Sequence, residues 1–424
     1  MNSVSVVTNN ADGAVPAPVF ASRYVGGLPA VSPSPPVGPR FLFDGGHNAP
    51  ELVPSDALAR AADHAIRAHG ALLARYQLGH GPLGFLPLRH VLADILARYR
   101  DIATSADNVL VTSGSGQGLD LVNATFVAPG DTVLVEEFTF HGAISRFRRA
   151  EAKLARVAVD EHGLQPEALA QVLTDLVARG VQPKFLYTIP TVQNPTGTIL
   201  SPERRQAVLA VADQFDLMIV EDDCYADLRW GETRTAALYA LRPDRVVYVG
   251  TLSKTLAPAL RVGYVVSGAD VLQQIAQSKR DGGTGALDQI VAAEYLAREF
   301  DAHLARLIPA LERKMHVMAA AVREEFGTAA EFVEPEGGIF IWIRLPDGTD
   351  SRAFQTAATA AGITYNPGNE WTAEPDAGKS RIRLCFAFNS EQEIREGVAR
   401  LAQLCFEATG VPARGANLDR ASVR

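Results

Sequence analysis

A single lysine between two strand-sized apolar runs constrains the folding of this sequence more than any other feature. The first run is Val246–Val249, which Gly250 ends, and the second is Val262–Val266. Lys254 lies in the connection between them. Lysines are seldom buried unless they are paired or used in chemistry, and a desolvated amine loses its proton readily and becomes a nucleophile. The pattern therefore indicates either a reactive lysine or an ordinary surface lysine between two strands.

Two polar side chains near Lys254 favour the reactive alternative. Ser253 precedes the lysine, and Arg261 stands at the end of the connection. A hydroxyl group and a cationic guanidinium fork are suited to binding a phosphate. A lysine able to form a Schiff base, next to a phosphate-binding group, suggests the cofactor pyridoxal 5'-phosphate (PLP).

Length and composition narrow the class of protein. The 424 residues are enough for more than one domain, and the apolar fraction of 47% is that of an ordinary globular protein. A net charge of −8 argues against nucleic acid or an anionic membrane as the main partner. The apolar runs are too short to span a membrane, and we expect no secretory signal.

The cysteines indicate the compartment. Cys224, Cys385 and Cys405 are too few and too scattered for a disulfide framework or a zinc site. We therefore expect a reducing, cytoplasmic environment and no bound metal.

Short apolar runs alternate with helical patterns along much of the chain. This alternation predicts an α/β domain with a mainly parallel sheet. Ligands of such sheets bind at the carboxyl ends of the strands, and each unusual polar cluster here follows a strand. The predicted strands of this domain are residues 108–112, 132–135, 153–159, 185–188, 217–220, 246–249 and 262–266.

A second, smaller unit is expected after the sheet. Residues 291–325 predict one or two long helices, and the strands and helices that follow suggest a small α+β domain. Proline-rich residues 1–40 predict an extended or flexible arm. The expected parts are an arm (1–40), a segment joining the small domain and the active site (41–60), a large PLP-binding domain (61–300), a small C-terminal domain (301–412) and a flexible tail (413–424).

A glycine- and serine-rich turn at Ser113–Gly118 follows one predicted strand and precedes a helix. Free backbone N–H groups and the positive end of the helix dipole make such a turn a candidate anion site. The same turn is common in α/β proteins without a ligand, so by itself it favours a plain tight turn.

Three motifs together identify a family. Residues 193–197 (QNPTG), 221–225 (EDDCY) and 250–261 (GTLSKTLAPALR) resemble fold-type I PLP enzymes. They are similar to class I and II aminotransferases, in the branch of the 2-aminoadipate and kynurenine aminotransferases and the MocR-type regulators. The resemblance runs from about Phe41 to about Leu404. It implies the PLP-dependent transferase fold of type I, PLP as the cofactor and a homodimer.

The resemblance implies roles for the residues around the reacting group. Lys254 matches the Schiff-base lysine, which also moves the substrate proton. Asp222 matches the partner of the pyridinium nitrogen, and Asn194 and Tyr225 match the donors to the phenolic oxygen. Asp223 is expected to be structural or paired with solvent.

Further residues correspond to the cofactor phosphate and ring. Phe140 matches the aromatic residue that stacks on the ring. The residues that the resemblance places around the phosphate are Ser115, Gly116, Ser253 and Arg261, with Tyr76 from the neighbouring subunit.

Arg383 matches the arginine that binds the substrate α-carboxylate, a role suited to its bidentate geometry. Arg381 lies two residues away and faces the same side of the predicted strand, so it is the obvious wrong choice. Asn194 is also expected near the substrate.

The sequence departs from the family pattern at several places, and two of them concern the predicted site. Gly116 stands where relatives usually carry glutamine, which would loosen one phosphate contact. His47 and Asn48, after Gly46, stand where relatives often carry Leu-Pro, in a segment that contributes to the substrate pocket. They suggest either a polar substrate side chain or a specialised reaction, or they only satisfy backbone groups of the loop.

Three functions are compatible with these motifs. The first is a PLP-dependent aminotransferase that moves an amino group from an L-amino acid to a 2-oxo acid. The second is a PLP-dependent cyclase, eliminase or other biosynthetic enzyme on the same scaffold. The third is a MocR-type PLP-binding regulator, which the acidic charge and the lack of a predicted N-terminal DNA-binding module disfavour.

Overall fold

The computed structural model of the protein describes residues 23, 38–231 and 234–414. The expected arm and tail therefore lie mostly outside the described residues. Every element described below lies within residues 39–424, the second of the two units into which the chain divides.

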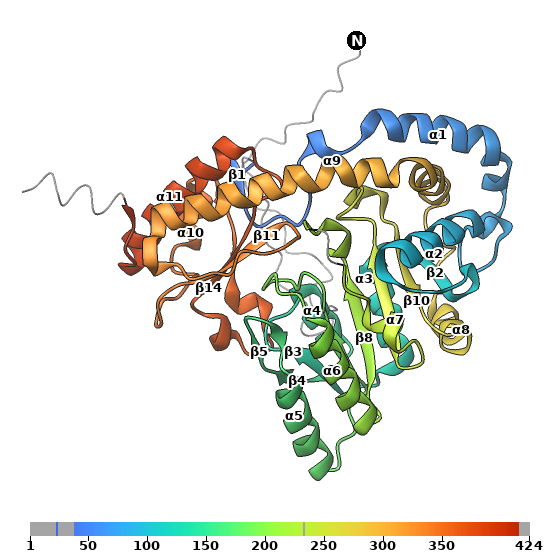
Figure 1. The fold of residues 1–424 in the computed structure, drawn as a ribbon, viewed down its shortest axis with the longest axis horizontal. Helices are drawn as coiled ribbons and strands as arrows, with labels where there is room; N and C mark the ends of the chain where they lie inside the picture. The colour runs from blue at the N-terminus through green and yellow to red at the C-terminus, as the bar shows by residue number, and fades with distance from the viewer. Residues whose placement is uncertain (1–22, 24–37, 232–233, 415–424) are drawn as a thin grey trace, which may run out of the picture. The chain divides into compact units, whose positions relative to one another are not determined.

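A seven-stranded sheet forms the centre of this unit (Figure 1). Its strand order is β2-β10-β9-β8-β7-β3-β4, and every neighbouring pair is parallel except the two that involve β10. The prediction of a mainly parallel sheet is thus confirmed. The strands are β2 (Val109–Thr112), β3 (Thr132–Glu136), β4 (Lys153–Val157), β7 (Phe185–Thr188), β8 (Met218–Asp223), β9 (Val246–Thr251) and β10 (Gly263–Val266).

Both faces of this sheet are buried, which explains why its strands are continuous apolar runs. In β9, Val246 and Tyr248 belong to one hydrophobic cluster, and Val247 and Val249 belong to another on the opposite face. Helices α1 (Ser55–His69), α2 (Leu86–Arg100), α5 (Pro166–Ala178), α6 (Pro202–Gln214) and the start of α9 contribute to the first cluster. Helices α3 (Ser115–Phe126), α4 (His141–Arg149) and α8 (Ala269–Ser278) contribute to the second.

The direction of β10 determines where Arg261 lies. The parallel strands end at one edge of the sheet, where their following loops begin. Because β10 is antiparallel to both of its neighbours, its first residue, Gly263, pairs with Thr112 and Thr251 at the ends of β2 and β9. Arg261, just before β10, therefore lies at the same edge as the residues that follow the parallel strands.

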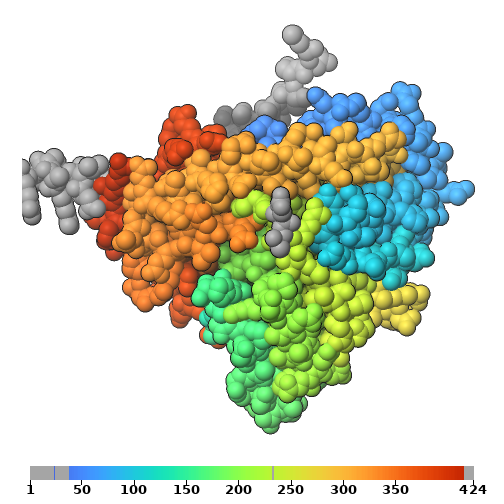
Figure 2. All heavy atoms as spheres, viewed as in Figure 1, coloured from blue at the N-terminus to red at the C-terminus, as the bar shows by residue number. Residues whose placement is uncertain are grey.

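One 41-residue helix, α9 (Ala286–Phe326), connects the hydrophobic clusters. Its first half packs with α1 and α2, and its second half packs with α11, as Figure 1 shows. In Figure 2 its side chains form a continuous ridge across the visible face. The expected domain boundary at 300/301 falls inside this helix, which contains Pro309.

The C-terminal part contains a three-stranded antiparallel sheet, β11-β14-β13, and a two-stranded parallel sheet, β1-β12. The β1–β12 pairing joins the segment after residue 40 to the C-terminal part. Its elements are β1 (Phe41–Leu42), β11 (Phe340–Arg344), α10 (Gln355–Ala360), β12 (Ile363–Thr364), β13 (Asn366–Pro367), β14 (Arg381–Cys385) and α11 (Glu391–Thr409).

The helical spacing of Leu58, Ala62, Ile66 and Leu73 predicts a helix from Ser55 to Tyr76, but α1 ends at His69. Two 3-10 helices follow it, η3 (Gly70–Ala74) and η4 (Tyr76–Gly79), and Gln77 and Leu78 adopt left-handed backbone conformations. Tyr76 therefore lies on a tight turn and not on a helix face.

The remaining elements are short and lie in the connections between the others. They are η2 (Pro50–Leu52), η5 (Ala106–Asn108), β5 (Val159–Asp160), β6 (Gly163–Leu164), η6 (Ala226–Leu228), α7 (Leu238–Leu241), η7 (Pro258–Leu260), η8 (Gly327–Ala329), η9 (Gly368–Trp371) and η10 (Pro375–Gly378).

No helix in the described part of the chain has the length and hydropathy needed to cross a membrane.

Candidate active site

A cavity of about 210 Å³ opens at the carboxyl edge of the central sheet. All the residues predicted to bind the cofactor line it, except Tyr76. They lie at or just after the carboxyl ends of five strands and in the segment before β10. The predicted residues that line it are Ser115, Gly116, Phe140, Asn194, Asp222, Tyr225, Ser253, Lys254 and Arg261.

One end of the cavity is suited to an anion. Helix α3 begins at Ser115, so its unpaired N–H groups and positive dipole end face this region. Gly114 precedes the helix with φ of 79°, and a Cβ atom there would lie 2.3 Å from Nη2 of Arg261. Position 114 therefore needs a glycine, because a side chain there would occupy the space that the Arg261 guanidinium fills.

Arg261 is held at this end in a strained conformation. Its backbone φ is 51°, in the left-handed region that non-glycine residues rarely occupy. Its guanidinium donates to the carbonyl oxygens of Ser113 (3.0 Å) and Pro258 (3.3 Å), and Nη1 lies 3.5 Å from Oγ of Ser253. These contacts place a hydroxyl and a cation together next to the α3 N-terminus.

Lys254 is largely enclosed at the other side of the cavity. Its Nζ donates to the backbone oxygen of Gly46, and burial lowers the pKa of its amine, with the charges of Arg383 and Arg261 adding to the effect. Asn48 Nδ2 donates to the backbone oxygen of Lys254 at 2.8 Å. The backbone role that the sequence left open for Asn48 is therefore present in the structure.

His47 packs edge-on against Phe388, with ring centroids 5.1 Å apart. Burial lowers the pKa of its imidazole, and the neighbouring Lys254 amine lowers it further. His47 is thus a neutral, aromatic neighbour of the lysine near neutral pH.

Asp222 is buried at the end of β8 and presents its carboxylate to the cavity. Tyr187 donates its hydroxyl to Oδ2 at 2.6 Å, and the Cys224 thiol lies 2.9 Å from Oδ1. Burial raises the pKa of Asp222, and the hydrogen bonds from Cys224 and Tyr187 oppose this rise. Two fixed donors therefore orient the carboxylate.

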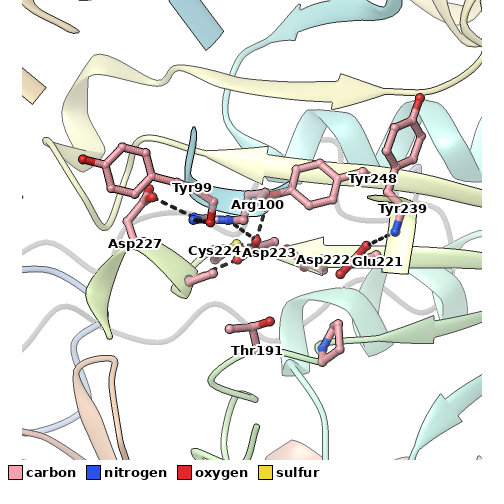
Figure 3. A network of polar contacts seen from close by, with 12 residues as sticks. Tyr99, Arg100, Thr191, Glu221, Asp222, Asp223, Cys224, Asp227, Tyr239 and Tyr248 are labelled. Carbon is pink, nitrogen blue, oxygen red and sulfur yellow. Dashed lines mark hydrogen bonds and ion pairs between the residues drawn. The ribbon is translucent and has the colours of Figure 1, made fainter. Parts of the chain in front are cut away.

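Asp223, the next residue, points away from Tyr187, toward Tyr248 and Arg100, and Figure 3 shows it beside Arg100. Arg100 donates to it at 2.6 Å and to Asp227 at 2.8 Å, and all three side chains are largely buried. Tyr248 donates its hydroxyl to the same Asp223 oxygen at 2.7 Å. The prediction that Asp223 is structural agrees with these contacts, although its partner is a buried arginine and not solvent.

Arg383 lies next to the cavity on β14. Its guanidinium stacks on Trp371 at 4.1 Å and donates to Oδ1 of Asn194 (3.1 Å) and Oδ1 of Asn366 (2.6 Å). Its Nε is buried without a hydrogen-bond partner. Arg381 instead lies over the ring of Phe138 and lines a different cavity.

Tyr76 does not lie in the cavity of its own chain. Its side chain is 91% exposed, and its ring lies beside Gly282, in the loop before α9.

Five residues that line the cavity were not predicted from the sequence: Arg146, Ile189, Cys224, Thr251 and Pro258. Arg146, on α4, donates to the backbone oxygen of Gly116 at 3.2 Å and pairs with Asp120 at 3.0 Å. A Cβ atom on Gly116 would lie 2.6 Å from Nη2 of Arg146, so the glycine makes room for this second cation. The departure at Gly116 was the signal that could have found it. Cys224 also lines the cavity, and no sequence pattern singled it out.

The donor set of this cavity fits PLP. An anion-binding helix terminus with two arginines, an amine of lowered pKa and an oriented carboxylate line one space, together with the aromatic ring of Phe140. These are the groups that bind a phosphate, an aldehyde and a pyridine nitrogen.

Comparisons with known proteins agree with this chemistry. Residues 46–401 match the model of the aminotransferase class I and II family. An aromatic-amino-acid aminotransferase of Thermococcus litoralis is 34% identical over 363 residues, which are 85% of this chain and 86% of the relative. An uncharacterized HTH-type transcriptional regulator of Bacillus subtilis is 30% identical over 331 residues, 77% of this chain and 67% of the regulator.

A solved structure gives the same result. The α-aminoadipate aminotransferase of Thermus thermophilus, in complex with N-(5'-phosphopyridoxyl)-L-leucine, superimposes with a TM-score of 0.80 at 32% identity, covering 88% of this chain and 93% of the other. The chain belongs to the class I and II aminotransferases and is a PLP-dependent enzyme of fold type I. The predicted fold, cofactor and aminotransferase activity are thereby confirmed.

Proposed function

We propose that Lys254 is the residue that binds PLP and that the protein transfers the amino group of an L-amino acid to a 2-oxo acid at this lysine. The observation that carries the proposal is the single cavity in which Lys254 lies with eight other residues predicted to contact the cofactor. When bound, PLP withdraws electrons from the substrate Cα and stores the amino group between the two half-reactions.

The surroundings of Lys254 support its role as nucleophile and base. Its pKa is lowered by burial, so its Nζ is deprotonated more readily than a surface lysine. Its backbone is fixed by Asn48, and the next residue, Thr255, donates its hydroxyl to Asp227 at 3.0 Å. We infer that the Nζ of Lys254 removes the Cα proton of the substrate and would deliver it to the cofactor carbon that takes up the amino group.

Asp222 is our candidate for holding a proton on the pyridine nitrogen of the cofactor. A carboxylate that is buried and oriented by two donors keeps its position without reorganisation during the reaction. The helix α3 terminus, Ser253, Arg261 and Arg146 are the candidates for the phosphate.

Arg383 is our candidate for the substrate carboxylate. Its position beside Asn194 and the unpaired Nε support this role, since a buried donor without a partner is costly. Arg383 would bind only the α-carboxylate, which all amino acids share. The relatives named for aromatic amino acids and α-aminoadipate therefore define the first donors to screen.

We also infer a homodimer. Tyr76 is exposed, and the apolar side chains of Ile66, Leu73 and Leu287 are also exposed, on α1, on η3 and at the start of α9. These residues lie on α1, η3, η4 and α9, which pack against one another. A patch of this kind is typical of a subunit interface.

The cellular location that we propose is the cytoplasm. Three free cysteines in the described residues support a reducing compartment of this kind.

The test is the first half-reaction alone. The PLP-loaded protein is mixed with one L-amino acid and no acceptor, and the 2-oxo acid and the aminated cofactor, pyridoxamine phosphate, are measured. Aminotransfer predicts one equivalent of each per site. Product without pyridoxamine phosphate would instead favour an elimination or cyclisation, and specific binding of promoter DNA by the full chain would favour a regulator.

A further inference from the structure

A second cavity, of about 410 Å³, lies between the C-terminal sheet on one side and β5 with the loops that follow β3 and β7 on the other. It shares no lining residue with the cofactor cavity. Val159 and Asp160 of β5 lie on one side, and Arg344 and Arg381, which pair directly across β11 and β14, lie on the other. We refer to it as the Arg381 cavity.

Aromatic rings separate the Arg381 cavity from Arg383. Phe138 and Trp342 line the cavity, with ring centroids 5.5 Å apart, and they pack with the fully buried Trp371. The Arg383 guanidinium stacks on the ring of Trp371. The two arginines of β14 therefore face different spaces although they lie only two residues apart.

Arg381 is the cation of this cavity that lacks a counterion. Its guanidinium carbon lies 5.4 Å from the centroid of Phe138, and within the described residues it makes no ion pair and no hydrogen bond. The side chain is partly buried, so water screens its charge less than at an open surface. A guanidinium in this position offers its donors to a ligand.

Of the other charged residues of the cavity, Asp160 and Arg344 are paired, whereas Glu161 is an exposed carboxylate whose nearest basic group is His162, at 3.9 Å. Asp160 forms a bidentate ion pair with Arg204, and each of its carboxylate oxygens lies 2.7 Å from a guanidinium nitrogen. Arg344 pairs with Asp347 (2.9 Å) and with Glu331 (3.4 Å). One unpaired positive charge among carboxylates favours a ligand with a single negative charge, because a phosphate dianion would be repelled by the acidic neighbours.

The remaining lining is largely aromatic and aliphatic. Phe138, Phe332 and Trp342 present ring surface, and Val159 and Val333 add aliphatic contacts. Rings of this kind favour a flat apolar ligand, since stacked aromatic pairs are stabilised beyond the effect of the area that they bury.

We propose that the Arg381 cavity binds an aromatic monocarboxylate, with the carboxylate on Arg381 and the ring against Phe138 and Trp342. The site is independent of the proposed function, because none of its residues lines the cofactor cavity. An occupant would touch β5 of the central domain and β11 and β14 of the C-terminal sheet at the same time.

The test is a calorimetric titration of the PLP-loaded protein with 1-naphthoate and, separately, with the uncharged 1-naphthamide. The Arg381→Gln variant is expected to bind naphthoate about tenfold to a hundredfold more weakly at this site, the loss typical of a charged hydrogen bond. The Arg383→Gln variant is the matched control and should keep the site. Naphthamide should bind the wild-type protein and Arg381→Gln equally.

Two results would overturn the proposal. One is naphthoate binding by Arg381→Gln that equals the wild-type protein, and the other is complete loss of binding in Arg383→Gln, which would place the ligand in the active site only. Circular dichroism confirms that each variant folds. If Arg381→Gln does not fold, Val333→Trp is used instead, because Val333 is exposed at the rim and a larger side chain there should fill the cavity and weaken binding.

Discussion

Asp222 and Asp223 are neighbours on β8 whose side chains point to opposite faces of the sheet. Alternation along a strand explains the difference. Asp222 faces the side of Tyr187 and the cofactor cavity, whereas Asp223 faces the side of Tyr248 and Arg100. Two adjacent residues of the same type therefore differ in what they contribute.

The two aspartates should respond differently to the same substitution. Asp222→Asn is expected to lower turnover by about a hundredfold with little loss of stability, because it removes a charge at the cofactor and keeps the side-chain shape. Asp223→Asn is expected to lower the free energy of unfolding by roughly 3 kcal/mol, because it weakens a buried ion pair and leaves Arg100 less compensated. Chemical denaturation and steady-state kinetics of both variants check this. Equal losses of stability in both would contradict the assignment.

Arg146 is expected to contribute to cofactor affinity. It lines the cavity at the α3 terminus because Gly116 leaves space for it. Arg146→Gln should raise the dissociation constant of PLP about tenfold, the usual value of a charged hydrogen bond. Fluorescence titration of the apoprotein measures it, with Arg149→Gln, an exposed residue of the same helix, as the control. An unchanged constant in Arg146→Gln would show that the guanidinium serves only Asp120 and the helix.

At the scale of elements, Glu136 joins the ends of β3 and β7 to the loop that carries Asn194. Its buried carboxyl accepts from Thr188 Oγ1 at 2.6 Å and from Gln193 Nε2 at 2.7 Å. Burial raises the pKa of Glu136 to about 7, against the opposing effect of these hydrogen bonds. The folded state therefore holds this proton more tightly than the unfolded chain.

This raised pKa predicts the sign of a pH dependence. Between about pH 4.5 and 7 the folded state binds more protons than the unfolded state, so the free energy of unfolding falls as the pH rises and becomes level above pH 7. For Glu136 the fall is roughly 3 kcal/mol. Urea unfolding from pH 5 to 8 measures the slope, which Glu136→Gln should reduce and Glu137→Gln, at a partly exposed neighbour, should leave unchanged. Glu221, whose pKa burial also raises to about 7, contributes its own share of the slope, so the result that would refute this origin is a slope in Glu136→Gln equal to that of the wild-type protein.

Elements were predictable from sequence where one periodicity dominated a segment. The continuous apolar runs of β8 and β9 predicted strands of a buried parallel sheet, and they are such strands. The antiparallel direction of β10 was not predictable, because it depends on pairing with β2, more than a hundred residues earlier. Tyr76 was expected to end a helix, but the left-handed residues Gln77 and Leu78 turn the chain there, and neither is a residue type that predicts such a turn.

Some residues of the candidate active site could be predicted from the sequence, and others could not. Lys254 follows β9 and Asp222 lies at the end of β8, both within short motifs, so the sequence was enough to predict that they line one cavity. Arg146 was missed because it reaches the cavity from α4 only through the space that Gly116 leaves by having no side chain. The pairing of Asp223 with Arg100, 123 residues apart, is likewise a property of the fold.

At the scale of the whole molecule, the exposed apolar patch around Tyr76 predicts a dimer. Leu287→Glu would place a charge in the proposed interface, and burying a charge without a partner there would oppose association. Light scattering should show a dimer for the wild-type protein and a shift toward monomer for the variant. Val177→Glu, at an exposed valine on α5, is the control and should remain dimeric. A monomeric wild-type protein would exclude the inferred interface.

The covalent attachment site of PLP tests the central claim most directly. The loaded protein is reduced with borohydride and digested, and the modified peptide is sequenced by mass spectrometry. Lys254 should carry the phosphopyridoxyl group, Lys254→Ala should carry none and lose turnover, and Lys314→Ala should behave as the wild-type protein, since Lys314 is also buried but donates to the backbone of Ala387. Label on another lysine, or normal turnover by Lys254→Ala, would contradict the assignment of Lys254.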